Sequence, residues 1–73
     1  MGEITVRSEV PGKVVDIEVE LGESVEEDDT LIMLESMKME IPVDSPEDAT
    51  VVKILVAVDD MVEEGEAIAI LET

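Results

Sequence analysis

The sequence contains no cysteine, no histidine and no aromatic residue, and these absences exclude several classes of function. Without cysteine there is no disulfide framework and no thiolate metal site. Without histidine the chain lacks a common zinc ligand, a common general base and the Ser-His and Cys-His nucleophile systems. Without aromatic rings it cannot stack on nucleobases or build aromatic cages for cations. We therefore expect no enzyme with catalytic residues of its own.

Basic residues are scarce. The chain has four lysines and arginines and 21 acidic residues, which gives a net charge of −17. Nucleic acids and anionic membranes are bound through basic patches, so this charge would repel both. No apolar run is long enough to span a membrane, and the N-terminus shows no signal-peptide pattern. The sequence predicts no nucleic-acid or membrane partner, a cytoplasmic location and a monomer in isolation.

The chain does have 45% hydrophobic residues over its 73 positions, which suffices for one small aliphatic core. Short apolar stretches bounded by turn residues predict β-strands rather than helices. In the first half these strands are expected at about 4–6, 13–21, 24–25, 30–35 and 39–43. Within the second of them, alternation predicts that Val15, Ile17, Val19 and Leu21 share the buried face.

The second half of the sequence repeats the first after a shift of 37 residues, with valine and isoleucine recurring at strand positions. Gly22 then corresponds to Asp59, and Asp28 to Gly65, so each half has one glycine and one aspartate in its turns. Both residue types accept a positive φ. Two strand-turn-strand copies without a linker predict a single all-β domain over residues 1–73, a pseudo-twofold sandwich or small barrel.

Between the two repeats, Met37 and Lys38 occupy the turn that joins two predicted strands. Two-residue hairpin turns favour Asn-Gly, Asp-Gly or Gly-X, which adopt positive φ at little cost, so Met-Lys is an unfavourable choice. Places where a sequence breaks a local rule are often functional. An exposed lysine on a rigid hairpin suits the carriage of a group, and the flexible Met37 and Met39 suit a surface recognised by several partners.

Several motifs carry a resemblance to a known family. Glu35-Ser36-Met37-Lys38-Met39 resembles Glu-Ala-Met-Lys-Met, the attachment motif of the biotinyl (biotin carboxyl carrier) domains. Val10-Pro11-Gly12, Gly22-Glu23-Ser24-Val25 and Asp59-Asp60-Met61-Val62 resemble turns of this family, and Ser45-Pro46 resembles its Ala-Pro. The likeness covers nearly the whole chain, and Met-Lys-Met within a matching twofold repeat is a specific signal.

The resemblance implies a flattened barrel of two four-stranded antiparallel sheets, a barrel-sandwich hybrid, with Lys38 at an exposed hairpin tip and both termini at the far end. It also implies the function of a biotin carboxyl carrier. A biotin protein ligase would attach biotin covalently to Lys38, and the carrier would move carboxyl groups between biotin carboxylase and carboxyltransferase subunits. Recognition by the ligase and these partners is expected at Met37 and Met39. The flanking recognition residues are expected to be Glu35, Ser36 and Glu40.

Some positions depart from the family pattern: Ser36 replaces alanine, and Asp28, Asp59 and Ala49 replace glycines. These changes concern turn geometry rather than the lysine. Two alternatives stay open, a lipoyl carrier domain of a 2-oxo acid dehydrogenase-type complex and a cofactor-free acidic interaction module. The lipoyl family typically surrounds its lysine with Asp and Ala, so Met-Lys-Met favours biotin. The carboxylase, its acyl substrate and the status as stand-alone protein or excised domain stay open.

Overall fold

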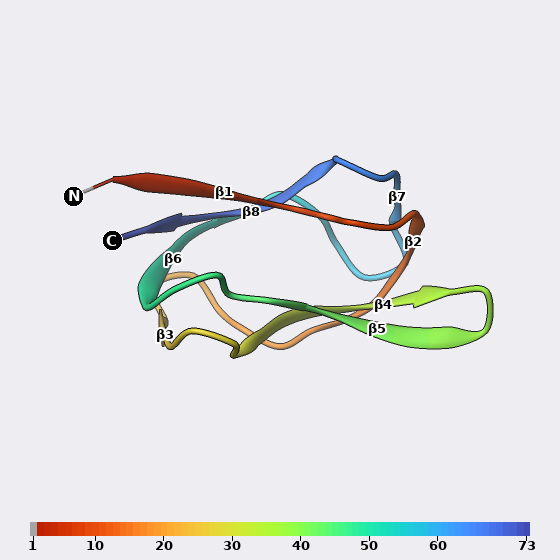
Figure 1. The fold of residues 1–73 in the computed structure, drawn as a ribbon, viewed down its shortest axis with the longest axis horizontal. Helices are drawn as coiled ribbons and strands as arrows, with labels where there is room; N and C mark the ends of the chain where they lie inside the picture. The colour runs from red at the N-terminus through yellow and green to blue at the C-terminus, as the bar shows by residue number, and fades with distance from the viewer. Residues whose placement is uncertain (1) are drawn as a thin grey trace.

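The computed structural model describes residues 2–73, in which all regular structure is β-strand (Figure 1). The strands are β1 (Glu3–Arg7), β2 (Gly12–Ile17), β3 (Ser24–Val25), β4 (Thr30–Ser36), β5 (Met39–Asp44), β6 (Ala49–Ile54), β7 (Met61–Val62) and β8 (Ala67–Glu72). They form two four-stranded antiparallel sheets, in the orders β1-β8-β6-β3 and β5-β4-β2-β7. The expected all-β class with two four-stranded sheets is confirmed.

The repeat in the sequence is also a repeat in the structure. A shift of 37 residues places β2 on β6 and β3 on β7 with identical bounds, and it converts one sheet order into the other. Hydrogen bonds recur in the same way, since the Gly22 N–H donates to the Val51 carbonyl at 2.7 Å and the Asp59 N–H donates to the Val14 carbonyl at 2.7 Å. Each half therefore closes its turn on a strand of the other half, and the two halves are intertwined.

The four turn positions identified from the repeat all adopt the left-handed conformation. Gly22 and Gly65 have φ of 85° and 84°, and Asp28 and Asp59 have φ of 74° and 80°. Aspartate is among the few non-glycine residues that visit this region readily. The prediction that glycine and aspartate exchange places between the halves without loss of the turns is confirmed.

The core lies between the two sheets and draws on both halves of the chain. Its buried hydrophobic residues are Val6, Val14, Val19, Val25, Leu31, Ile32, Leu34, Ala49, Val51, Val62, Ile68, Ala69 and Leu71. All are aliphatic, and each half contributes to the packing of the other. Since a large aliphatic side chain gains about 1.5–3 kcal/mol on full burial, this shared core is the main source of stability.

One predicted strand, 13–21, is wrong at its C-terminal end, because β2 ends at Ile17. A β-bulge follows Val14, where two residues of β2 lie opposite one residue of β4. The extra residue changes the phase of the alternation, so that Val14 is fully buried and Val15, expected inside, is only half-buried. Leu21, also expected inside, lies in the turn beyond the strand and is 66% exposed.

The β4–β5 hairpin projects at one end of the molecule, and both termini lie at the other end (Figure 1). At the terminal end the Thr73 N–H donates to the Gly2 carbonyl at 2.9 Å. The molecule measures 36 × 18 × 18 Å, so its long axis separates the termini from the hairpin tip. β5 is the edge strand of its sheet, as Pro42 within it predicts. Residues 2–73 contain no helix that is long and apolar enough to cross a membrane.

Candidate functional site

The tip of the β4–β5 hairpin is a two-residue turn made of Met37 and Lys38. Ser36 and Met39 are the last cross-strand partners before it. Met37 has a φ of 51° and Lys38 a φ of 66°, so both central residues are left-handed, as a type I′ turn requires. A non-glycine residue in this region costs about 1–2 kcal/mol, and the hydrogen-bonded ladder below the tip must offset that cost.

The side chains at this tip point into solvent. Met37 is 93% exposed and Met39 is 63% exposed, and Lys38 between them is exposed as well. Among the described residues, the Lys38 amine has no ion pair or hydrogen bond, and the one ion pair formed joins Lys13 Nζ to Asp59 Oδ1 at 3.5 Å. The amine is therefore available to an external reagent, and the methionines add no packing to the core.

The flanking residues predicted from the sequence lie on the same hairpin. Glu35 of β4 and Glu40 of β5 are direct cross-strand partners, one row below the pair formed by Ser36 and Met39. Both glutamates are exposed, and Ser36 is half-buried. Like charges placed directly opposite each other destabilise a strand pair. The hairpin therefore presents two adjacent carboxylates below the tip that bears Lys38, at some expense to its own stability.

A residue that the sequence reasoning passed over lies at the base of this hairpin. A β-carbon built on Gly12 of β2 would lie 2.7 Å from the Glu35 carbonyl oxygen and 3.5 Å from the Ser36 β-carbon. The missing side chain at Gly12 lets β2 approach β4 closely where the hairpin leaves the sheet. The sequence marked this glycine only as the end of the Val10-Pro11-Gly12 turn and as the counterpart of Ala49 in the repeat.

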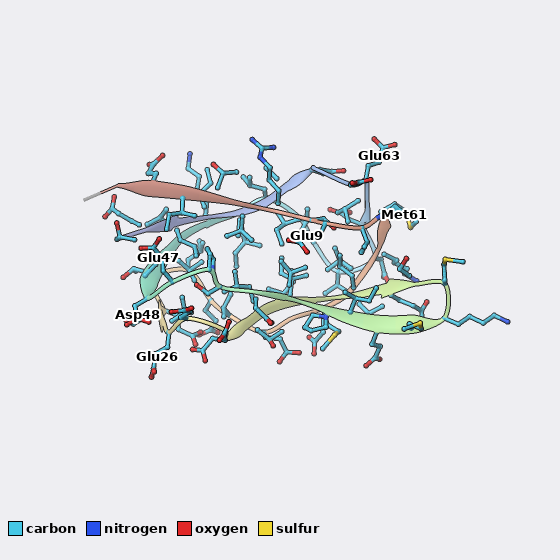
Figure 2. The ribbon with its side chains drawn as sticks, viewed as in Figure 1. Glu9, Glu26, Glu47, Asp48, Met61 and Glu63 are labelled. Atoms are coloured by element: carbon cyan, nitrogen blue, oxygen red, sulfur yellow. The ribbon has the colours of Figure 1, made fainter. Side chains whose placement is uncertain are left out.

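A second residue that only the structure reveals is Met61. It pairs with Lys13, which in turn pairs with Glu35, which pairs with Glu40. Cross-strand partners share a face of the sheet, so these four side chains form a row across its outer surface. Figure 2 places Met61 at the same end of the molecule as the hairpin.

The chemistry available at this site is that of one accessible primary amine. The amine can be acylated after it loses a proton, but no side chain among residues 2–73 is hydrogen-bonded to it to accept that proton. The described residues also contain no cluster of three or more acidic side chains able to hold a metal ion. The site thus offers one exposed primary amine that an external reagent can reach.

Comparison with known proteins places these features in a family. The family model described as "Biotin-requiring enzyme" matches residues 3–71. A protein of Mycobacterium leprae named as a homologue of biotinylated protein TB7.3 is 39% identical over 66 residues, covering 90% of this chain and 93% of its own. The gamma subunit of methylmalonyl-CoA decarboxylase from Veillonella parvula is 40% identical over 50 residues, covering 68% of this chain and 39% of the subunit.

Solved structures agree with these sequence relatives. A single-chain, multi-domain long-chain acyl-CoA carboxylase contains a region that superposes with a TM-score of 0.92 at 27% identity, over 97% of this chain and 7% of the carboxylase. Urea carboxylase of Kluyveromyces lactis also gives a TM-score of 0.92, at 32% identity, over 97% of this chain and 6% of the enzyme. This chain therefore spans a small part of the large carboxylases but nearly all of the mycobacterial relative. It belongs to the biotin/lipoyl attachment family of biotin-requiring enzymes.

Proposed function

We propose that this chain is a biotin carboxyl carrier in which a biotin protein ligase attaches biotin to Lys38 through an amide bond. The observation that carries the proposal is the exposed, unpaired amine of Lys38 at the tip of a rigid hairpin, between two exposed methionines. The chain supplies no catalytic group of its own and acts as a mobile substrate for its partners. When bound, biotin supplies the nitrogen that carries a carboxyl group.

The attachment reaction defines what Lys38 must do. Its ammonium loses a proton to a base, and the neutral amine attacks the carbonyl carbon of biotinyl-adenylate. A C–N bond forms, the C–O bond to the phosphate breaks, and AMP leaves with the bonding electrons. Because no described side chain contacts the amine, we infer that the ligase provides the base. The product has one positive charge fewer, so the carrier becomes more acidic.

The hairpin suits the subsequent carriage of a group. The backbone at Met37 and Lys38 is held by the β4–β5 ladder, whereas the four-carbon stem of the lysine is free to rotate. Side chains on loop tips of rigid scaffolds combine accurate placement with mobility. The termini lie at the opposite end of the molecule, so a partner enzyme can approach the tip without meeting them (Figure 1).

The partners proposed for this carrier are a biotin carboxylase and a carboxyltransferase, as separate subunits or as domains. Relatives named for methylmalonyl-CoA, glutaconyl-CoA, pyruvate and urea chemistry share this module, although the named substrates differ. The partner enzyme, rather than the carrier, must therefore select the substrate. We extend the proposal to a single carrier domain over residues 1–73 that works in the cytoplasm as a monomer.

Biotin is favoured over lipoate by two observations. The relative that is matched over 93% of its own length is named as a homologue of a biotinylated protein, and the modified lysine would lie between Met37 and Met39 rather than between Asp and Ala. A cofactor-free interaction module would not require an unpaired lysine on a strained turn, because an ordinary turn residue would be less costly there.

The test is the intact mass of the purified protein after incubation with a biotin protein ligase, ATP and biotin. We expect one biotinyl group on the parent and none on Lys38→Arg, which keeps the charge. Lys53→Arg, which alters an exposed lysine on β6 far from the tip, is the matched control and should be modified fully. If the Lys38→Arg variant were biotinylated, the attachment site would be a residue other than Lys38. Addition by a lipoyl ligase alone, or by neither enzyme, would replace the proposal with one of the alternatives.

A further inference from the structure

The pseudo-twofold symmetry provides an internal reference for the surface beside Lys38. At the hairpin end, a row of cross-strand partners runs Glu40, Glu35, Lys13, Met61 across the outer face of one sheet. At the terminal end, the equivalent row of the other sheet runs Glu3, Glu72, Thr50, Ser24. The two rows occupy the same positions of the fold after the shift of 37 residues.

The two rows differ only in their third and fourth residues. Both begin with two opposed glutamates, so the acidic pair alone does not distinguish the end that bears Lys38. Lys13 replaces Thr50 and Met61 replaces Ser24. A small polar residue therefore satisfies the fold at the position of Met61, and the packing of the domain does not explain a methionine there.

Apart from Met37 and Met39 at the hairpin tip, the other large exposed apolar residues among residues 2–73 do not show this asymmetry on the same sheet. Leu21 and Val58 are both exposed, and they correspond to each other in the repeat. Each half therefore has an apolar residue at this position, so the two ends of the molecule do not differ there. Leu55 corresponds to Glu18 but follows β6 in the opposite sheet, and it is 46% exposed. Met61 is 71% exposed and lies on the sheet that carries Lys38.

Met61 also lies within reach of a partner that acts on Lys38. Met61 is two strands from Glu35, about 10 Å across the sheet, and Lys38 lies two residues from Glu40, the partner of Glu35, about 7 Å further along the strand direction. A protein interface of standard size buries about 800 Å² on each partner, which corresponds to a radius of about 16 Å. An enzyme seated on the hairpin tip with an ordinary footprint can therefore contact Met61.

We propose that Met61 is a specificity-determining contact for the biotin protein ligase that modifies Lys38, entering an apolar pocket on a basic surface of that enzyme. The basic surface complements the carboxylates of Glu35 and Glu40 on a chain of net charge −17. Lys13 does not oppose this attraction strongly, since Asp59 lies 3.5 Å from its amine. The inference rests on the proposed function, because it names a residue that the ligase uses to recognise the carrier.

The experiment measures KM and kcat for biotinylation of parent, Met61→Ser, Met61→Leu and Ser24→Met. Met61→Ser installs the residue found at the equivalent position, and we expect KM to rise about three- to tenfold, the scale of losing one well-buried apolar contact. The kcat should stay unchanged, because Met61 is too far from the reacting amine to touch it. Met61→Leu should keep the KM of the parent. Ser24→Met, at the end of the molecule that bears the termini, should change neither KM nor kcat.

The outcomes separate this inference from the proposed function. If Met61→Ser has the parent KM while Lys38→Arg accepts no biotin, the carrier function stands and the role of Met61 is overturned. A loss of kcat without a change in KM, or a Met61→Leu variant as poor as Met61→Ser, also overturns it. If the parent itself accepts no biotin, both proposals fail. The thermal midpoints of the Met61 and Ser24 variants should match that of the parent. Equal midpoints would show that a change in KM reports recognition by the ligase and not a loss of folding.

Discussion

At the scale of single residues, the site combines an accessible amine with local backbone strain. Met37 and Lys38 both hold positive φ, although neither residue type favours that region. Strain of this kind persists where surrounding structure maintains it, and here the six-row β4–β5 ladder does so. The turn itself would be more stable with residues such as Asn-Gly, so the packing of the fold does not explain Met37 and Lys38 at the tip.

Replacing the two turn residues together, Met37→Asn with Lys38→Gly, should therefore stabilise the fold. Asn-Gly adopts the type I′ turn at little cost, so we expect the free energy of unfolding to increase by about 1–2 kcal/mol, measured by urea denaturation. The same variant should accept no biotin. The matched control is Lys38→Ala, which retains most of the strain and should stay close to the parent stability. An unchanged or lower urea midpoint in Asn-Gly would show that the turn is not strained.

At the scale of secondary-structure elements, the hairpin depends on how closely β2 approaches β4. Gly12 makes this approach possible, since any side chain there would meet the backbone carbonyl of Glu35. In the other half, Ala49 of β6 occupies the equivalent position and is almost fully buried. The two ends of the molecule therefore differ in strand packing, and the end that needs the tighter approach is the one that bears the lysine.

Gly12→Ala should destabilise the protein, because a 2.7 Å contact with a backbone oxygen requires the strands to shift. We expect a loss of about 1–3 kcal/mol in the free energy of unfolding, the usual range for overpacking. Gly2→Ala is the control, since its new β-carbon would have the Thr73 hydroxyl as nearest contact at 3.9 Å. If Gly12→Ala unfolds at the same urea concentration as Gly2→Ala, the strands accommodate the methyl group without cost.

At the scale of the whole molecule, electrostatic repulsion opposes folding. The net charge is −17, and among the described residues a single ion pair is formed. Some acidic residues nonetheless stabilise turns: the Glu26 N–H donates to Asp29 at 2.9 Å, and the Ala57 N–H donates to Asp60 at 2.9 Å. The remaining carboxylates repel one another, and the folded state holds them closer than the unfolded chain does.

Stability should consequently rise as the pH is lowered from 7 to about 5 and as salt is added at pH 7. The pKa of Glu18 is raised above the ordinary value of 4.5. The main cause is a side-chain hydrogen bond with Asp16, followed by the negative charge of Asp16 and a slight loss of hydration. The folded state therefore binds this proton more tightly than the unfolded state, so stability increases as pH falls through the raised pKa. Asp16→Asn should remove part of the pH dependence.

The measurement is the thermal midpoint as a function of pH and of NaCl concentration. Salt should raise the midpoint more at pH 7 than at pH 5, because fewer charges remain to be screened at the lower pH. A midpoint that falls steadily between pH 7 and pH 5 would show that turn carboxylates, rather than repulsion, dominate the electrostatics of this fold.

Most of the strand pattern and the position of Lys38 could be predicted from the sequence, because both depend on local features. Alternation of apolar residues indicates strands, a recurring residue set indicates the repeat, and an unfavourable turn between strands indicates the tip. The left-handed aspartates at 28 and 59 followed from the same repeat. The likeness to the biotinyl domains added the arrangement of the sheets, which the structure confirms.

The tertiary structure alone decided the features that depend on register between distant segments. The bulge after Val14 changes which valine enters the core, and it arises from pairing with β4 rather than from the local pattern. Gly12 is required because another strand's carbonyl lies against it. Met61 acquires its place beside the site because β7 pairs with β2 across nearly fifty residues of chain. Sequence periodicity carries no information on such contacts, since each is set by the partner strand that folding brings alongside.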